Sequence, residues 1–240
     1  TDPAFGEALK YDMAIQTISQ ILVAEGTDGV LSAARPGSIV IDCTTSDPAS
    51  TRRLGAELAG RDIGLVDAGM TRGVAGAKQG TLAFFLGGED RHIERALPLL
   101  KALGDTFVHV GPLGHGHTAK LISNVLSYAT VALVNEAFML GARSGLDLGR
   151  LQEALGEGAP SKALEAFGPR LRSGEYEPPR VTIEHVCDDM VMLQALAAKT
   201  ASPVAMLSTA QELYRLLQMQ GGGVRDMSTL AELWRSAGKA

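Results

Sequence analysis

The distribution of hydrophobic and polar positions predicts one long helix in the middle of the chain, from about Thr118 to Gly141. No glycine or proline interrupts the residues between these two positions, and Gly141 and Gly145 end the pattern. The apolar residues leave almost no polar face, so we expect a helix that is buried on most of its circumference. These apolar residues are Leu121, Ile122, Val125, Leu126, Ala129, Ala132, Leu133, Ala137 and Leu140.

The residues before this helix alternate between helical and strand patterns. A strand, a helix and a second strand in that order make a βαβ unit, whose strands pair in parallel. We therefore expect an α/β fold with a parallel sheet in this part of the chain. The predicted elements are a helix over 12–25, a strand over 38–42, a helix over 48–59, strands over 63–67 and 81–86, a helix over 90–103 and a strand over 106–110.

Beyond Leu146 almost every pattern is helical. The predicted helices cover residues 147–155, 160–173, 181–199, 203–220 and 228–237, and Thr229 with Glu232 predicts a capping box for the last one. The sequence thus predicts an α/β domain over 1–112 and an all-α domain over 113–240, which begins with the long helix over 118–141.

A stripe of polar residues runs along the long helix. Its members follow at steps of three, four and seven and are Lys120, Asn124, Ser127 or Tyr128, and Asn135. Burial and the positive N-terminal end of a helix both disfavour an ammonium ion, so Lys120 is a candidate general acid or base. Asn124 would hold a substrate oxygen or orient the amine. The alternative is that Lys120 extends to solvent and Asn124 satisfies a backbone group.

Two further polar segments follow predicted strands. Thr44, Thr45 and Ser46 come after the strand over 38–42, at the end where ligands bind in open α/β sheets, although Ser46 or Asp47 also suits the cap of the next helix. Residues 69–80 contain four glycines and predict a tight loop whose amides can approach an anion. Beside that loop, Thr71, Arg72 and Gly73 offer a hydroxyl, a charge and a backbone amide for a carboxylate, whereas an ordinary turn would explain most of the glycines.

Composition narrows the classes of function. The chain has 240 residues, 45% of them hydrophobic, and a net charge of −5 without a run of either sign, so we expect a small-molecule ligand and no nucleic acid. Cys43 and Cys187 are far apart, and His115 and His117 lack acidic partners at ligand spacing, so we expect no disulfide and no metal site. No apolar run of membrane-spanning length and no signal-peptide pattern is visible, which predicts a soluble, cytoplasmic protein.

Four motifs, taken in order, resemble the β-hydroxyacid dehydrogenase family, typified by 3-hydroxyisobutyrate dehydrogenase and related to 6-phosphogluconate dehydrogenase. Residues 67–82, DAGMTRGVAGAKQGTL, resemble the family's substrate loop D-A-P-V-S-G-G-x-x-G-A-x-x-G-T-L. The signature G-x-G-x-x-x-K-x-x-x-N is matched by Gly114, Gly116, Lys120 and Asn124. Residues 188–190, DDM, stand where the family has K-D-L, and 223–228, GVRDMS, resemble its G-x-x-D-x-S. The likeness covers roughly residues 12–235.

The resemblance implies a partial Rossmann-type sheet followed by an all-α domain like the C-terminal domain of 6-phosphogluconate dehydrogenase. It implies an NAD- or NADP-dependent interconversion of a small 3-hydroxy acid and its aldehyde or keto acid, in a homodimer built on the helical half. By this resemblance Lys120 is the general acid or base, Asn124 positions the reacting oxygen, and the substrate carboxylate is bound by Thr71, Arg72 and Gly73. The resemblance also implies that Thr45 and Asp189 bind the cofactor.

The sequence departs from the family at three points. The preceding βαβ unit with its G-x-G-x-x-G turn is not found, Asp188 replaces the Lys of K-D-L, and Arg72 replaces a Gly, which would shift preference toward a more acidic or polar substrate. Two accounts of the front of the chain stay open. One is an incomplete sequence with a hidden junction between Ala8 and Leu9, and the other is a truncated paralogue that binds a small carboxylate or a protein partner without catalysis.

Overall fold

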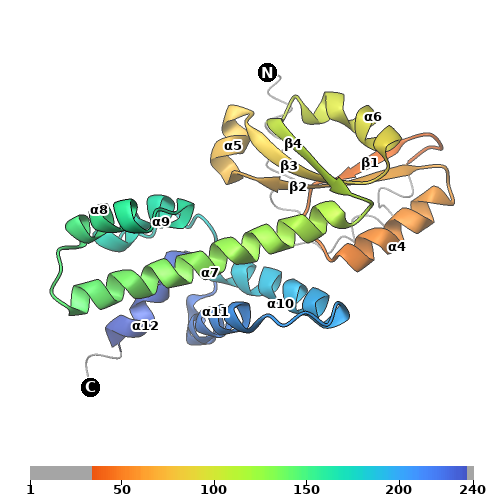
Figure 1. Ribbon diagram of the computed structural model, residues 1–240. Coiled ribbons are helices and arrows are strands. Elements are labelled where there is room, and N and C mark those ends of the chain that lie inside the picture. Colours follow the sequence, from red (N-terminus) through yellow and green to blue (C-terminus); the bar gives the residue numbers. More distant parts are fainter. Residues whose placement is uncertain (1–33, 237–240) are drawn as a thin grey trace. The chain divides into compact units, whose positions relative to one another are not determined.

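The computed structural model describes residues 34–236. The chain divides into two compact units between Ile122 and Ser123, and this division falls inside the longest helix, α7 (His115–Arg143). Figure 1 shows α7 as the element that runs from one unit into the other. The helix predicted over 12–25 and the junction between Ala8 and Leu9 lie outside the described residues.

The described part of the first unit is built on a four-stranded mixed sheet in the order β1-β2-β3-β4. The strands are β1 (Ile39–Asp42), β2 (Gly64–Thr71), β3 (Leu82–Gly87) and β4 (Gly104–Gly111). The predicted parallel pairing of β1 with β2 is confirmed, and β3 pairs with β4 in parallel. However, β2 and β3 are antiparallel, because the connection between them is too short for a parallel crossover.

Helices cover both faces of this sheet. Figure 1 shows α4 (Pro48–Ala59) on one face and α6 (Asp90–Leu100) on the other. Alternate residues of β2 point to opposite faces, so Leu65 packs with the α4 side and Val66 with the α6 side. The bounds of α4 are those that the sequence predicts, since Asp47 caps its first turn by accepting from the Ala49 amide.

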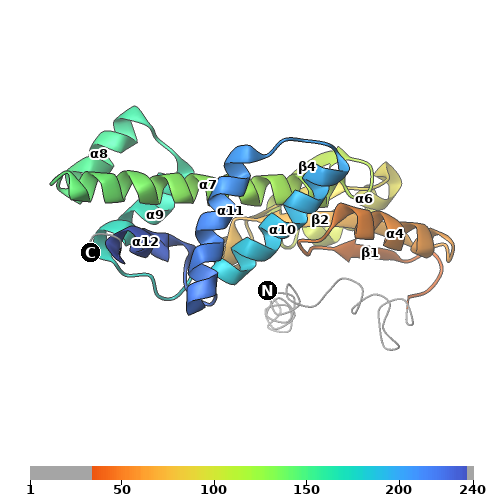
Figure 2. The same cartoon turned by 90° about the horizontal axis from the view of Figure 1, so that it is seen from below.

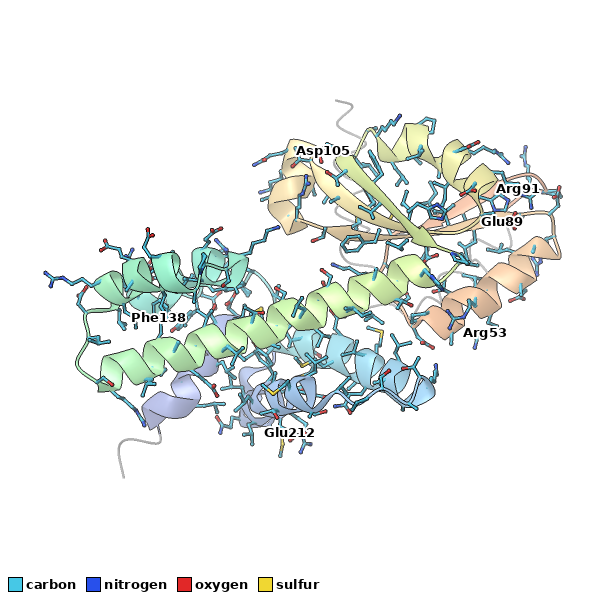
Figure 3. The ribbon with its side chains drawn as sticks, in the orientation of Figure 1. Arg53, Glu89, Arg91, Asp105, Phe138 and Glu212 are labelled. Carbon is cyan, nitrogen blue, oxygen red and sulfur yellow. The ribbon has the colours of Figure 1, made fainter. Side chains whose placement is uncertain are left out.

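The second unit is helical. Its helices are α8 (Leu148–Gly158), α9 (Lys162–Ser173), α10 (Ile183–Lys199), α11 (Ala205–Leu217) and α12 (Ala231–Ser236), with a π-helical turn at Gln218–Gly222 and a 3-10 turn at Met227–Leu230. Figure 2 shows α10 and α11 side by side, and the two helices contact each other and each has buried residues. Phe138 of α7, labelled in Figure 3, packs into one core with Leu164 and Leu171 of α9.

Two local predictions are wrong. The glycine-rich segment is not a loop throughout, because β2 continues to Thr71 and Gly73–Gln79 forms the short helix α5. The predicted capping box is also absent from the described residues. Asp226 is the cap of the turn at Met227–Leu230, Thr229 donates to the Asp226 carbonyl oxygen, and Glu232 pairs with Arg225 instead.

The buried side of α7 is narrower than the pattern predicts. Leu121, Val125, Val131 and Phe138 are buried, whereas Ile122, Leu126, Leu133 and Leu140 are more than half exposed. Among the described residues α7 is also the helix that is long and apolar enough, by length and composition, to cross a membrane. A core helix of a globular protein passes the same test, and the packed residues of α7 fit that case.

Candidate functional site

The helix that carries Lys120 is capped by a buried carboxylate from the sheet. Asp67 lies on β2 and is fully buried, and its two oxygens accept from the Gly114 and His117 backbone amides at 2.8 Å each. A carboxylate at this position satisfies N–H groups that the first turn of a helix leaves without partners. The start of α7 is therefore fixed to the sheet.

Glycine at position 116 lets the helix come close to the strands. A Cβ at Gly116 would lie 2.5 Å from the Phe85 carbonyl oxygen and 2.6 Å from that of Asp67. Any larger residue would push the first turn of α7 away from β2 and β3. Gly116, in the first turn of α7, thus serves the close packing of this helix against the sheet.

Lys120 lies over the carboxyl-terminal half of β2. A Cβ built on Gly69 would be 2.6 Å from the Cβ of Lys120 and 3.1 Å from its Cγ, so the side-chain stem crosses the strand at a glycine. Lys120 is half-buried. Because β1 ends opposite Asp67, Gly69 lies beyond the end of β1, on the side where the Thr44–Ser46 segment begins. This is the edge at which ligands bind in α/β sheets.

The segment after β1 is held by its own side chains. The Asp42 Oδ1 atom accepts from the Thr44 amide at 3.0 Å and from the Thr44 hydroxyl at 2.6 Å, and the Thr44 and Ser46 hydroxyl oxygens are 2.7 Å apart. Thr45 stands between these two residues and is half-buried. Asp42 thus fixes the turn that presents Thr45.

Asn124 is oriented by a buried carboxylate in the second unit. Its Nδ2 donates to the Oδ2 atom of Asp189 at 2.7 Å, and the Tyr128 hydroxyl donates to the same oxygen at 2.7 Å. Burial and the Asp189 carboxylate raise the pKa of Tyr128 well above its usual value, so the phenol stays protonated and remains a donor. Tyr214 in turn donates to the Tyr128 carbonyl oxygen.

The Asp189 side chain is 1% exposed and accepts from Asn124 and Tyr128, so in this structure it supports Asn124. The neighbouring Asp188 is exposed, and partial burial and then Glu184 raise the pKa of its carboxyl group. Asn135, the last member of the polar stripe, is structural, since it donates to the Val131 carbonyl and accepts from the Ala231 amide.

The Arg72 side chain is held by hydrogen bonds to the strand β4 and to the residue before β3. The guanidinium donates to the Thr81 carbonyl at 2.6 Å, to Asp105 at 2.7 Å and to the Thr106 hydroxyl at 2.8 Å. Figure 3 labels Asp105 near the start of β4. The Thr106 hydroxyl and Arg72 lower the pKa of Asp105. Arg72 therefore joins the turn after β2 to β4, and its own backbone is left-handed, with φ of 77°.

Thr71 and Gly73 flank this arginine. Thr71 is the last residue of β2, and Gly73 begins α5 with φ of 57° and open space where a Cβ would be. Thr71, Lys120 and Thr45 all belong to the first unit. The structure places Thr71 two residues beyond the glycine on which Lys120 packs.

The sequence analysis assigns no role in this arrangement to three residues: Asp42, Asp67 and His117. The first two share a signal, because each is a carboxylate that ends or interrupts a buried apolar strand, and their Cα atoms pair across β1 and β2. His117 stands three residues before Lys120 and is completely buried. Nothing in the local pattern distinguishes it from an exposed histidine at a helix start.

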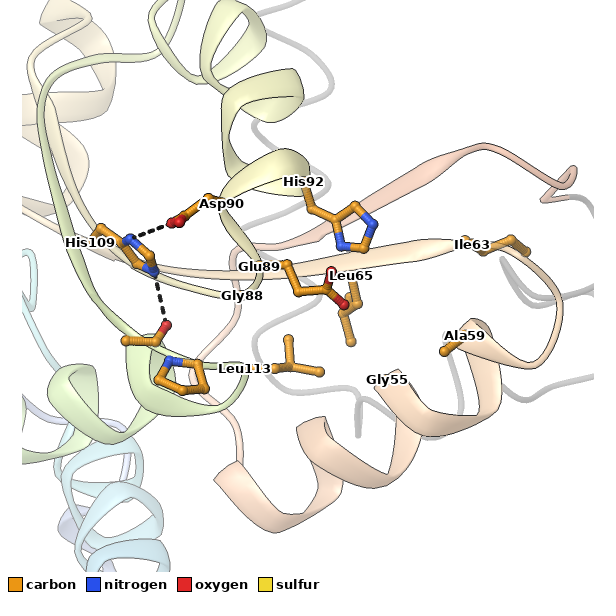
Figure 4. A pocket seen from close by; sticks show the side chains of 12 residues that line it. Gly55, Ala59, Ile63, Leu65, Gly88, Glu89, Asp90, His92, His109 and Leu113 are labelled. Atoms are coloured by element: carbon orange, nitrogen blue, oxygen red, sulfur yellow. Dashed lines mark hydrogen bonds and ion pairs between the residues drawn. The ribbon is translucent and has the colours of Figure 1, made fainter.

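A separate pocket of about 610 Å³ opens in the first unit, between α4 and the ends of β3 and β4. Figure 4 shows His109 on its wall, with Nδ1 3.3 Å from Asp90 and Nε2 3.0 Å from the Gly111 carbonyl oxygen. The described residues that line it include none of the predicted site residues. The pocket is therefore distinct from the surroundings of Lys120.

The described residues fit one end of a dinucleotide. The close approach of Lys120 to β2 at Gly69 and the fixed turn around Thr45 form a polar edge at the carboxyl end of two parallel strands. Thr45 is the residue at that edge that would contact the nicotinamide end of a cofactor.

Family models match almost all of the chain. The model described as the NAD binding domain of 6-phosphogluconate dehydrogenase matches residues 15–111. The model described as the NAD-binding region of NADP-dependent 3-hydroxyisobutyrate dehydrogenase matches residues 114–234. The two matches meet at the start of α7.

Individual relatives agree with these models. The chain is 34% identical over 214 residues to NAD-dependent L-serine dehydrogenase of Pseudomonas aeruginosa, a match that covers 86% of this chain and 72% of the relative. The structure resembles 3-hydroxyisobutyrate dehydrogenase from Salmonella typhimurium with a TM-score of 0.81 and 25% identity, over 89% of this chain and 74% of the other. It also resembles Mycobacterium tuberculosis 3-hydroxyisobutyrate dehydrogenase with L-serine, with a TM-score of 0.79 and 25% identity, over 86% and 73% of the two chains.

Proposed function

Since this chain belongs to the β-hydroxyacid dehydrogenase family, we propose that it oxidises a small 3-hydroxy acid of the serine or 3-hydroxyisobutyrate type and carries out the reverse reduction. As a member of that family it is an NAD- or NADP-dependent oxidoreductase. The observation that carries the assignment of its residues is the contact of Lys120 with Gly69, at the carboxyl end of the paired strands.

In this proposal Lys120 is the general acid and base. During oxidation the neutral amine takes the proton of the substrate hydroxyl, while the hydride of the carbinol carbon leaves and the carbonyl forms. In the reverse direction the ammonium returns the proton to the carbonyl oxygen. The nicotinamide, when bound, takes up or supplies the hydride. The first carbon atoms of the Lys120 side chain pack against β2 at Gly69. The side chain therefore loses little conformational entropy when its amine binds the reacting oxygen.

Asn124 acts one helical turn after Lys120. We assign it the hydrogen bond that positions the reacting oxygen, and we assign Asp189 the task of holding the Asn124 amide in place. A carboxylate that accepts from both Asn124 and Tyr128 fixes which way the Asn124 side chain points. Asp189 is thus a positioning residue in this account, in place of the cofactor contact that the resemblance implies.

The substrate carboxylate binds at the turn after β2. The Thr71 hydroxyl and the Gly73 amide are the groups that we assign to it. Arg72 contributes by tying this turn to Asp105 and Thr106, so its charge is already paired. A substrate with one carboxylate therefore suits the turn, and the extra charge of Arg72 does not call for a more acidic one.

A homodimer in the cytoplasm completes the proposal. Leu126, Leu133 and Leu140 recur every seven residues along α7, and their side chains are 64%, 55% and 69% exposed. A stripe of this spacing faces one direction on a helix and is the pattern by which helices pair. A second copy of the chain is the partner that we propose for it.

The test is turnover with a matched set of substrates. L-serine and 3-hydroxyisobutyrate are each supplied with NAD or NADP, and formation of the reduced nicotinamide is followed by its absorbance. The same alcohols with the carboxylate replaced by hydrogen, ethanolamine and propan-1-ol, serve as controls. The proposal expects turnover of an acid and little of its control. Equal rates with both, or no turnover with either cofactor, would refute it.

A further inference from the structure

The His117 ring joins the first turn of α7 to the end of β1. It is completely buried, and its Nδ1 atom lies 2.7 Å from the Thr51 hydroxyl of α4. Its Nε2 atom makes no hydrogen bond among the residues that the structure describes, and it faces the Asp42 Oδ1 atom at 3.8 Å. A buried polar atom with such a neighbour calls for an explanation, because burial without a partner costs free energy.

The tautomer follows from these contacts. The Thr51 hydroxyl has two acceptors within reach, Nδ1 of His117 at 2.7 Å and the Asp47 carbonyl oxygen at 3.3 Å. The shorter contact favours donation to Nδ1, because 3.3 Å is long for a hydroxyl donor, and donation to Nδ1 leaves the proton of the neutral ring on Nε2. That N–H then points toward the Asp42 carboxylate across a gap about 1 Å longer than a hydrogen bond. Attraction between the N–H dipole and the carboxylate acts at this distance, and a small movement makes a direct bond.

Asp42 passes this constraint on to the segment that carries Thr45. The same Oδ1 atom that faces His117 accepts from the amide and the hydroxyl of Thr44. Thr44 precedes Thr45 directly, and its hydroxyl reaches Ser46 on the other side. His117 therefore contacts Asp42, Asp42 binds Thr44, and Thr44 contacts Ser46, so these contacts connect the His117 ring to the two residues that flank Thr45.

We propose that His117 is a positioning residue that holds the Thr44–Ser46 turn in its cofactor-binding conformation. The ring fixes Asp42 relative to the first turn of α7, three residues before Lys120, and Asp42 fixes the turn. His117 itself touches neither substrate nor reacting atoms. The effect on cofactor affinity rests on the proposed function, whereas the effect on the turn is a property of the protein alone.

The Kd for the cofactor and the alkylation rate of Cys43 both depend on the equilibrium between the closed and open conformations of the Thr44–Ser46 turn. If the turn is competent only a tenth of the time, the apparent Kd for a cofactor that needs it rises about tenfold. Cys43 immediately precedes the turn and is half-buried, so its alkylation rate reports the same opening. The chain has only one other thiol, Cys187, which is buried, and burial raises its pKa to about 11. Peptide mass spectrometry separates the two sites.

The variants are His117→Leu, which keeps volume but removes both ring nitrogens, and His117→Gln, whose amide can accept from Thr51 and donate to Asp42. We expect His117→Leu to raise the Kd for the reduced nicotinamide about tenfold and the iodoacetamide rate at Cys43 about fivefold, with kcat at saturating cofactor changed less than about threefold. His117→Gln should restore both values to within about twofold of the parent chain.

Thr229→Val is the matched control. It removes a buried hydroxyl that donates to the Asp226 carbonyl in the second unit, so it lowers the thermal midpoint without touching the turn. If His117→Leu lowers the midpoint as Thr229→Val does and leaves Kd and the Cys43 rate unchanged, the proposal is overturned.

Should His117→Leu fail to fold, Thr51→Val removes the hydroxyl that orients the ring and must raise the Cys43 rate at least about twofold. An unchanged rate overturns the proposal. A parent chain that binds neither NADH nor NADPH refutes the proposed function alone, because the Cys43 comparison needs no cofactor and decides the role of His117 in the turn by itself.

Discussion

Replacing Gly69 by alanine should impair catalysis far more than it impairs folding. The new Cβ would lie 2.6 Å from the Cβ of Lys120 and 3.1 Å from its Cγ. Carbon atoms in contact are about 3.5–4 Å apart, so Lys120 and β2 must separate by about 1 Å. Overpacking of this kind costs about 1–3 kcal/mol of stability. A displacement of about 1 Å at a reacting group lowers the rate by up to about a hundredfold.

The assay compares kcat, cofactor affinity and the midpoint of thermal unfolding for Gly69→Ala. We expect kcat to fall about ten- to a hundredfold at a temperature where the variant is folded, with the Kd for NADH or NADPH changed little. Gly156→Ala is the control, because Gly156 lies inside α8 with nothing within 4 Å of an added Cβ. It should be neutral or stabilise by about 0.5–1 kcal/mol. A folded Gly69→Ala variant with the parent kcat would refute the placement of Lys120.

Four further outcomes are expected. Lys120→Ala should abolish most turnover and leave cofactor binding intact, as seen by fluorescence titration. Asp189→Asn should lower kcat about tenfold and the free energy of unfolding by about 1–3 kcal/mol, since it disturbs two hydrogen bonds to a buried carboxylate. Leu133→Glu should make the chain monomeric in analytical ultracentrifugation, because it places a charge within the exposed stripe. Burial raises the pKa of Cys187 from 9.0 to about 11, so the folded protein keeps a proton that the unfolded chain has lost. That contribution to stability is complete below pH 9 and is lost as the pH rises toward 11, and Cys187→Ala should show a shallower decline in urea unfolding over this range.

Local signals in the sequence were sufficient for the elements that are fixed by nearby residues. The helix over 48–59 is one case, because Asp47 and Pro48 mark its start in the sequence and also in the structure. The long helix is another, although its ends extend to His115 and Arg143. Its capping group is Asp67, far away in sequence, so no pattern near residue 115 reveals where the helix begins.

The parts that could not be predicted depend on contacts across the fold. Arg72 looks like a ligand for an anion in the sequence, and only the arrival of β4 beside the turn supplies Asp105 and Thr106 as its partners. The exposed leucines of α7 have the same apolar character as its buried ones, so the sequence pattern cannot separate them. His117 gains its neighbours from α4 and β1, which a linear reading does not bring together.

The most direct test of hydride transfer uses a hydroxy acid deuterated at the carbinol carbon. L-serine or 3-hydroxyisobutyrate labelled in this way is incubated with the parent chain and NAD or NADP, and the reduced nicotinamide is analysed by mass spectrometry. The account predicts one deuterium in the reduced nicotinamide, formed far more slowly by Lys120→Ala. Reduced nicotinamide without the label, or none formed from either acid, would contradict it.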